Sequence, residues 1–221
     1  LTGCLVGAGL LAVVWRLLPL RPSPVAELAR FEAAQSIDTP IVRGAGTVPS
    51  VPPPGFRFLD SRQLGVRLAV PEYLASRDLG STLGVAEFEV FEELANRSET
   101  DVDDLLTDQL SSIDAMAIDE DGTAVNIMRI ASRQVPTAAE LQPLIDPLEM
   151  TGAEFTEVKT AFGRGTGLRS GMPLKDGTIV VHGHILWARS AKAVFSVQVT
   201  SVDPIIADTL YEVILRTVQP V

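Results

Sequence analysis

Alternating apolar and polar residues predict a pair of short strands in residues 56–71, FRFLDSRQLGVRLAVP. In the second half of this stretch, Leu64, Val66, Leu68 and Val70 occupy every second position. A period of two places such side chains on one face of a strand. We therefore expect two strands here, with a turn between them.

Two segments have the apolar spacing of an amphipathic helix. The first begins at Ser98 or Thr100, either of which can cap it, and extends to about Met116. The second begins at Asp203-Pro204, an N-cap residue followed by proline at the first helical position. Their apolar faces are Val102, Leu105, Leu106, Leu110 and Ile113 in the first, and Ile206, Leu210, Val213 and Ile214 in the second.

Further strands are expected around these helices. They comprise residues 84–94, 125–135 and 154–162, and a hairpin of residues 179–188 with 193–200. Residues 136–153 are expected to be irregular or briefly helical, because Pro143 and Pro147 interrupt them. The order of strands, helix, strands and helix predicts the α+β class, with helices packed on an antiparallel sheet.

The first twenty residues, LTGCLVGAGLLAVVWRLLPL, have the composition of a membrane-spanning helix. No charge occurs before Arg16, and about 20 apolar residues cross the hydrocarbon layer of a bilayer. We expect a single-pass anchor in the plasma membrane, with the C-terminal domain outside the cytoplasm. Small residues that would let a partner helix pack closely form two pairs: Gly3 with Gly7, and Ala8 with Ala12.

Two alternatives to an anchor are open for this stretch. Leu1-Thr2-Gly3-Cys4 matches a bacterial lipobox in its letters, which would make Cys4 a lipidation site. In a lipoprotein precursor, however, the apolar run precedes the cysteine, whereas here it follows. A buried core helix is disfavoured by the polar, proline-rich residues that come next.

The composition changes again at Gly55, which we take as the start of the folded domain. Residues 38–55, DTPIVRGAGTVPSVPPPG, lack an apolar period and are rich in proline and glycine, as tethers are. The predicted organisation is an anchor in residues 1–20, a juxtamembrane segment and tether in residues 21–55, and an extracytoplasmic α+β domain in residues 56–221.

The charge balance limits the classes of partner. Asp and Glu total 28 against 18 Lys and Arg, a net charge of −10. Nucleic acid is therefore not expected as a partner, since phosphate binding needs clustered basic residues. The single cysteine excludes a disulfide within the chain.

Candidate catalytic and metal-binding motifs are incomplete. His182 and His184 share one face of a predicted strand and are weak candidates for metal ligands, because a metal site needs further ligands. Ile179, Val181, Ile185 and Trp187 share the other face, which we expect to be the core side. FGRGTG, residues 162–167, is read as a turn or strand end, since no helix is expected after it. We expect no cofactor and no enzymatic activity.

The element order of residues 56–218 resembles the PsbP-like fold, and within it the mycobacterial LpqN-type lipoproteins. The resemblance is carried by GFRFLDSRQLGVRLAVPEYL, in which two strands end in a proline turn, Val70-Pro71-Glu72-Tyr73. Two features depart from it: a membrane span replaces the lipid anchor, and the proline-broken segment 136–153 is unusual. The resemblance implies accessory and binding proteins, and no catalytic residues.

These observations predict a non-enzymatic accessory subunit of a multi-subunit membrane complex in an actinobacterial envelope, with a respiratory complex as one candidate. Its partners would be the integral membrane subunits and the membrane itself. The alternative is an envelope protein that binds a lipid or another small ligand in a cavity between sheet and helices.

Overall fold

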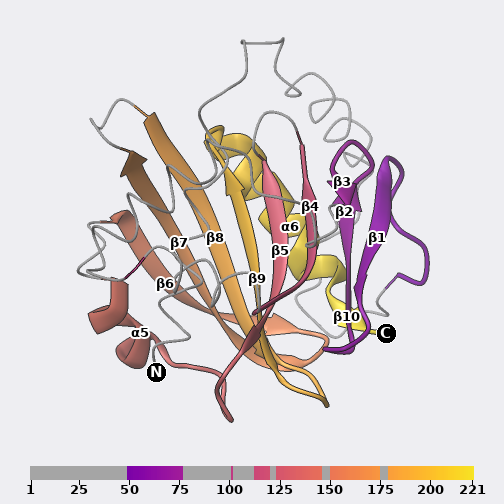
Figure 1. Cartoon of the computed structure of the whole chain (residues 1–221), viewed down its shortest axis with the longest axis horizontal. Helices are drawn as coiled ribbons and strands as arrows, with labels where there is room; N and C mark the ends of the chain where they lie inside the picture. The colour runs from indigo at the N-terminus through magenta and orange to yellow at the C-terminus, as the bar shows by residue number, and fades with distance from the viewer. Residues whose placement is uncertain (1–48, 77–100, 102–111, 120–122, 146–149, 175–178) are drawn as a thin grey trace.

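Two antiparallel sheets and two helices make up the part of the chain that the computed structural model describes, namely residues 49–76, 101, 112–119, 123–145, 150–174 and 179–221 (Figure 1). This confirms the α+β class, with a mostly antiparallel sheet and two helices in the described residues. Within these ranges no helix has the length and apolar character needed to cross a membrane. The predicted anchor with Cys4 and its small-residue pairs, the tether up to residue 48 and the strand predicted at residues 84–94 lie outside the described residues.

The larger sheet has seven strands in the order β3-β4-β5-β9-β8-β7-β6. Short turns join β6 to β7 and β8 to β9, so the strands on one side of the sheet follow one another as hairpins. The predicted hairpin of residues 179–188 and 193–200 is confirmed as β8 and β9. The strands comprise β3 (Ala75–Ser76), β4 (Ile113–Ile118), β5 (Ala124–Ile130), β6 (Thr151–Thr160), β7 (Gly163–Leu174), β8 (Ile179–Arg189) and β9 (Val194–Ser201).

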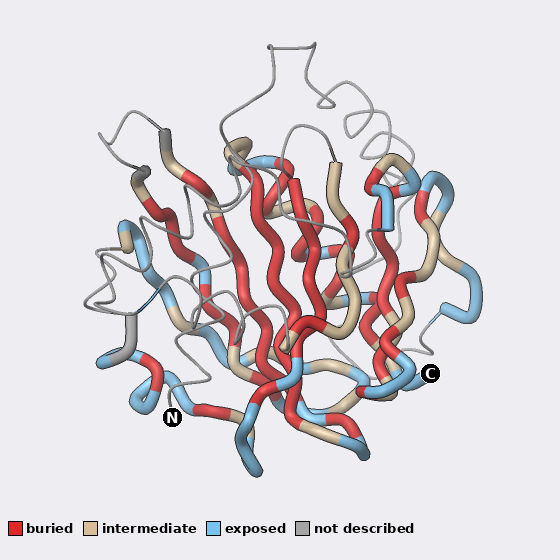
Figure 2. The backbone as a smooth tube through the Cα atoms, in the orientation of Figure 1, coloured by how far each residue is buried: buried red, intermediate tan, exposed pale blue. Residues whose placement is uncertain are grey.

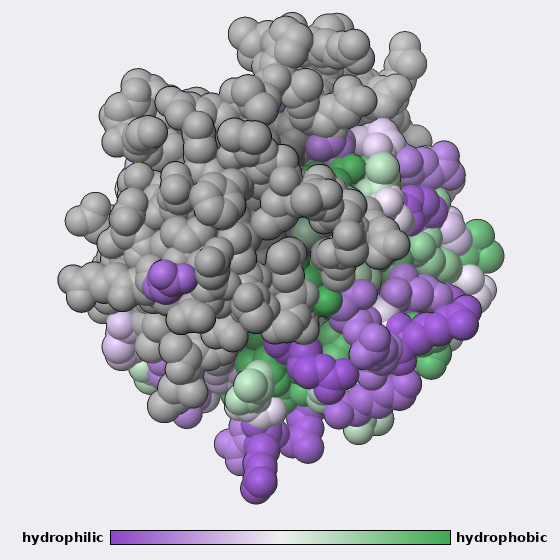
Figure 3. Space-filling model, in the orientation of Figure 1, coloured by the Kyte–Doolittle hydropathy of each residue, from purple (hydrophilic) through white to green (hydrophobic). Residues whose placement is uncertain are grey.

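The smaller sheet contains the two strands predicted from residues 56–71. β1 (Phe56–Ser61) pairs with β2 (Val66–Pro71), which in turn pairs with the short β10 (Gln219–Pro220). Gly65 takes the left-handed conformation in the turn, with φ of 67°. On this sheet Arg67 donates two hydrogen bonds to Asp60 at 2.6 and 2.7 Å. The visible surface over β1 and β2 mixes hydrophilic with apolar side chains (Figure 3).

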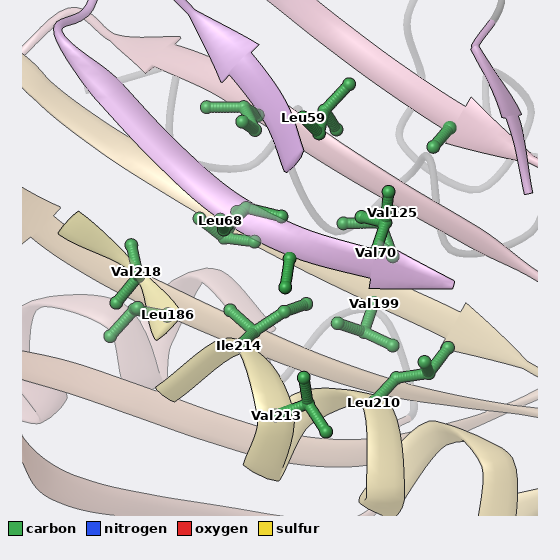
Figure 4. Close-up of a cluster of buried hydrophobic side chains, with 14 of the residues drawn as sticks. Leu59, Leu68, Val70, Val125, Leu186, Val199, Leu210, Val213, Ile214 and Val218 are labelled. Carbon is green, nitrogen blue, oxygen red and sulfur yellow. The ribbon is translucent and has the colours of Figure 1, made fainter. Parts of the chain in front are cut away.

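Helix α6 (Pro204–Thr217) lies across one face of the larger sheet (Figure 1). Asp203 caps it as predicted, and its carboxylate accepts hydrogen bonds from the backbone N–H groups of Ile205 and Ile206. Its apolar face packs against β2, β8 and β9, as Figure 4 shows. The buried residues of this core include Leu68, Val70, Leu186, Val199, Leu210, Val213, Ile214 and Val218.

Helix α5 (Ala138–Ile145) falls in the segment expected to be irregular or briefly helical. Thr137 and Glu140 form a capping box in which each side chain bonds the backbone N–H of the other, at 2.8 and 3.4 Å. This cap explains why a short helix forms there although Pro143 lies within it.

Three sequence expectations differ from the structure. Residues 113–116 belong to strand β4, not to the end of a helix, because Ile113 and Met116 pair with residues of β5. The strand expected over residues 125–135 ends at Ile130, beyond which the chain bends. Of residues 162–167, expected to be a turn or strand end, all but Phe162 lie instead at the start of the long strand β7.

Both faces of the central strands are buried (Figure 2). Every residue of β9 is buried, and Leu186 on β8 belongs to the core beneath α6. The expectation that the face of Val181, Ile185 and Trp187 is the core side is therefore wrong in part. Those residues are buried, but the cluster under α6 lies on the opposite face, which also carries the histidines.

Candidate functional site

Five buried polar side chains lie on the face of the larger sheet that points away from α6. Side chains alternate between the faces of a strand. Val197 and Val199 pack in the core beneath α6, so the residues between and beside them point to the other face. The five side chains, each at most 4% exposed, are Asn126, Ser170, Ser196, Gln198 and Thr200. We call this set the polar row.

Strand register brings the polar row together. Asn126 of β5 lies directly opposite Gln198 of β9. Thr200 lies opposite Gly183 of β8, and Gly183 lies opposite Ser170 of β7. Direct neighbours on adjacent strands have Cβ atoms about 5 Å apart. The row therefore forms one patch across four adjacent strands rather than isolated polar positions.

The polar atoms of this row have no hydrogen-bond partner among the residues that the structure describes. This holds for both amide atoms of Asn126 and of Gln198, and for the three hydroxyl oxygens. A buried polar group without a partner costs about 1–3 kcal/mol. Most such groups in native proteins are bonded to protein or to bound water, so five together require a partner.

The side chains of the polar row carry no charge. Two amides and three hydroxyls supply both hydrogen-bond donors and acceptors. The residues that the register places beside them, among them Met128, Ile185 and Trp187, are apolar and buried. A buried patch of this kind suits a partner that is uncharged, carries donors and acceptors, and has an apolar part, because the described members of the patch include no charged group that would balance a buried charge.

His184 lies on the opposite face, beneath α6. Its Nε2 lies 2.7 Å from Oδ1 of Asp208, whose other carboxylate oxygen accepts a hydrogen bond from Arg169. Its ring stacks on the ring of Tyr211, with centroids 4.6 Å apart. Burial lowers the pKa of His184, and the hydrogen bond that its ring donates to Asp208 opposes that shift.

The surroundings of His184 restrict access to both ring nitrogens, which a metal ligand or a general base would need. Its Nε2 is held by Asp208, and its Nδ1 is buried away from solvent and has no partner within the described ranges. Neither nitrogen is open to an incoming metal ion or substrate. His182, two residues earlier on the same face, is partly buried and lies opposite Ser201 and Gly171. The described residues contain no cluster of three or more His, Cys, Asp or Glu side chains that could hold a metal ion.

The glycine-rich motif lies in a hairpin. Ala161 and Phe162 form the turn, and Gly163 begins β7 with φ of 101°. No helix follows the motif, as a phosphate-binding loop would require. Gly165 and Gly167 lie on the α6 side, where a Cβ atom on Gly167 would lie 2.7 Å from the Tyr211 hydroxyl. The glycines therefore allow close packing of sheet and helix.

The polar row was missed in the sequence, although a signal was there. In VFSVQVTS, residues 194–201, polar residues alternate with valines. Such alternation is typical of a strand with one face in water, and only the fold reveals that both faces are buried.

The chain matches no protein-family model and has no significant match among curated proteins. The polar row and the residues around His184 are therefore interpreted from their geometry.

Proposed function

We propose that this protein is a non-enzymatic binding protein whose domain holds a small, uncharged ligand against the polar row. The observation that carries the proposal is the set of buried amide and hydroxyl groups on neighbouring strands, which have no partner among the described residues. The ligand would offer donors and acceptors to Asn126 and Gln198, and apolar surface to the side chains around them. This corresponds to the ligand-binding alternative drawn from the sequence.

Several expectations from the sequence belong to the same proposal. They are the PsbP-like fold, the single-pass anchor in the plasma membrane and the position of the domain outside the cytoplasm. A binding role without catalysis is consistent with the position of His184, because neither of its ring nitrogens is accessible to a substrate.

The test is to identify what leaves the protein when it unfolds. Full-length protein would be purified from membranes in mild detergent, denatured, and its released small molecules measured by mass spectrometry. We expect one uncharged compound in near-stoichiometric amount from the wild type. The doubly substituted variant Asn126→Leu/Gln198→Leu should release little of it, since leucine fills a similar volume without hydrogen-bonding groups.

The variant must be folded for this comparison, which circular dichroism and thermal unfolding would establish. The matched control is Ser132→Ala, which removes an exposed hydroxyl that is not a member of the polar row. Equal release of the compound by wild type and leucine variant would refute the site. Release of nothing by either protein, with a leucine variant more stable than wild type, would show that the row binds only water.

The accessory-subunit function is a second candidate, and the exposed edge of the larger sheet favours it. β6 is the last strand on its side of the sheet, and most of its residues are exposed. A strand of this kind can pair with a strand of another protein molecule.

A further inference from the structure

Strand β6 offers a long pairing edge. It forms one end of the larger sheet, and β7 is its neighbour on the inner side (Figure 1). Seven of its ten residues are exposed, and Phe155, Val158 and Thr160 are partly buried. Proteins usually protect such an edge with proline, with a bulge or with unmatched charge. β6 contains no proline, and its irregularity is confined to the first residues, between Thr151 and Glu154.

The hairpin decides which backbone groups face outward. Thr160 lies opposite Gly163 across a two-residue turn, and the residues that close such a turn bond to each other. Because hydrogen-bonding direction alternates along an antiparallel strand, Phe155, Glu157 and Lys159 turn their backbone N–H and C=O groups toward the outer edge.

The charges along this edge are complementary to a second copy of the same strand. If two β6 strands run antiparallel about Val158, Glu157 of each lies opposite Lys159 of the other. Glu157 of one copy and Lys159 of the other then form a hydrogen-bonded pair, because the backbone N–H and C=O groups of both residues face the outer edge. A register centred on Glu157 would instead place two carboxylates opposite each other, which is destabilising.

We propose that β6 is a homodimer interface, in which two copies of the chain pair antiparallel about Val158 and join their larger sheets into one. Lysine on a free edge normally prevents pairing. In the proposed dimer, however, each Lys159 lies opposite Glu157 of the other copy, which has the opposite charge. The contact that Glu157 makes within its own chain, to Arg164 at 3.6 Å, joins two exposed side chains and is weak enough to be exchanged.

The first test reverses the charges. Molecular mass would be measured by light scattering for the full-length protein in detergent, at low salt. We expect the wild type to be dimeric. Glu157→Lys and Lys159→Glu should each weaken dimerisation by several-fold, because each places like charges opposite each other. The double exchange Glu157→Lys/Lys159→Glu should restore the dimer, since the pair is re-formed with reversed signs.

The second test fixes the register. In a Cys4→Ser background, Val158→Cys should form a covalent dimer on mild oxidation, because residues opposite each other in a non-hydrogen-bonded pair have Cα atoms about 4.5 Å apart, within disulfide range. Phe155→Cys is the matched control, since its counterpart in the partner lies about six residues away along the strand, roughly 20 Å. A monomeric wild type would overturn the proposal. A dimer that is unchanged by either single substitution, or that is linked equally by both cysteines, would overturn it as well.

Discussion

The imidazole ring of His184 stacks on the ring of Tyr211, with their planes 15° apart. The contact places a titratable ring from β8 beneath the helix that closes the core. Nε2 of the ring faces Asp208, but the buried Nδ1 has no acceptor among the described residues. A doubly protonated ring would have to bury an unpaired N–H group, so the fold favours neutral His184.

This predicts that stability falls on mild acidification. The pKa of His184 is lowered in the folded protein, chiefly by burial. Below about pH 6.5, the ordinary histidine pKa, the unfolded chain takes up a proton that the folded protein does not. Stability should therefore decrease as the pH falls from 6.5, by at most about 1.4 kcal/mol per pH unit from this residue.

Urea unfolding at pH 7.5 and 5.5 would measure the effect. His184→Phe keeps an aromatic ring on Tyr211 and should remove this part of the pH dependence. His182→Gln, two residues away on the same strand face, should leave it in place. A wild type and a His184→Phe variant with the same difference between the two pH values would contradict the prediction.

Gly167 is predicted to be required for the packing of α6. A Cβ atom there would lie 2.7 Å from the Tyr211 hydroxyl and 2.9 Å from the Thr156 hydroxyl, both closer than van der Waals contact. Overpacking of this kind costs about 1–3 kcal/mol, so Gly167→Ala should lower the free energy of unfolding by that amount.

A double-mutant cycle tests whether the Tyr211 hydroxyl causes the loss. Tyr211→Phe alone should have a small effect, because its hydrogen bond to the Ile185 carbonyl is long, at 3.4 Å. In the Tyr211→Phe background, Gly167→Ala should cost less than in the wild type. Strictly additive free energies would show that the clash with Tyr211 is not the cause.

Local patterns predicted the elements that local chemistry determines. Helix α6 was recognised because Asp203 and Pro204 mark its start and its apolar spacing is regular. The β8–β9 hairpin is indicated by two runs that residues 189–192 close, and strand β2 by its alternating residues. In each case the signal lies within a few residues of the element it specifies.

The remaining elements and the polar row depend on contacts between segments far apart in the sequence. Ile113 continues the apolar spacing of the preceding segment, yet it pairs with Met128 in the sheet. The glycines of β7 indicate a turn in sequence, whereas Gly165 and Gly167 allow neighbouring groups to approach a strand closely. The polar row forms only when β5, β7, β8 and β9 pair in their observed register. A pattern within one short segment of sequence cannot specify that pairing.

Removing the cap of α6 should destabilise the domain. The Asp203 carboxylate accepts hydrogen bonds from the N–H groups of Ile205 at 2.8 Å and Ile206 at 3.3 Å. Asp203→Ala leaves these groups without their partner and should cost about 0.5–2 kcal/mol in urea unfolding. Asp203→Asn keeps a capping oxygen and should lose much less. Equal losses in the two variants would show that the negative charge, rather than the hydrogen bonds, stabilises the helix.

Ser190 is predicted to stabilise the contact between the β8–β9 turn and the β1–β2 turn of the smaller sheet. Its buried hydroxyl donates to the Leu64 carbonyl at 2.6 Å, and accepts from the backbone N–H groups of Lys192 at 3.0 Å and Ala193 at 3.1 Å. Ser190→Ala would leave the Leu64 carbonyl buried without this donor, so we expect a loss of about 1–3 kcal/mol.

Ser132 provides a matched comparison for Ser190. Its hydroxyl also bonds the backbone of a nearby residue, donating to the Gln134 carbonyl at 2.8 Å, but it is exposed. Water can replace that bond, so Ser132→Ala should change the free energy of unfolding by less than about 0.5 kcal/mol. Hydrogen exchange would localise the effect: in Ser190→Ala the amides of β1 and β2 should lose some protection, because one of the hydrogen bonds that join them to the larger sheet is gone. Equal losses of stability for the two serines, or unchanged protection in β1 and β2, would show that the buried hydroxyl does not join the sheets.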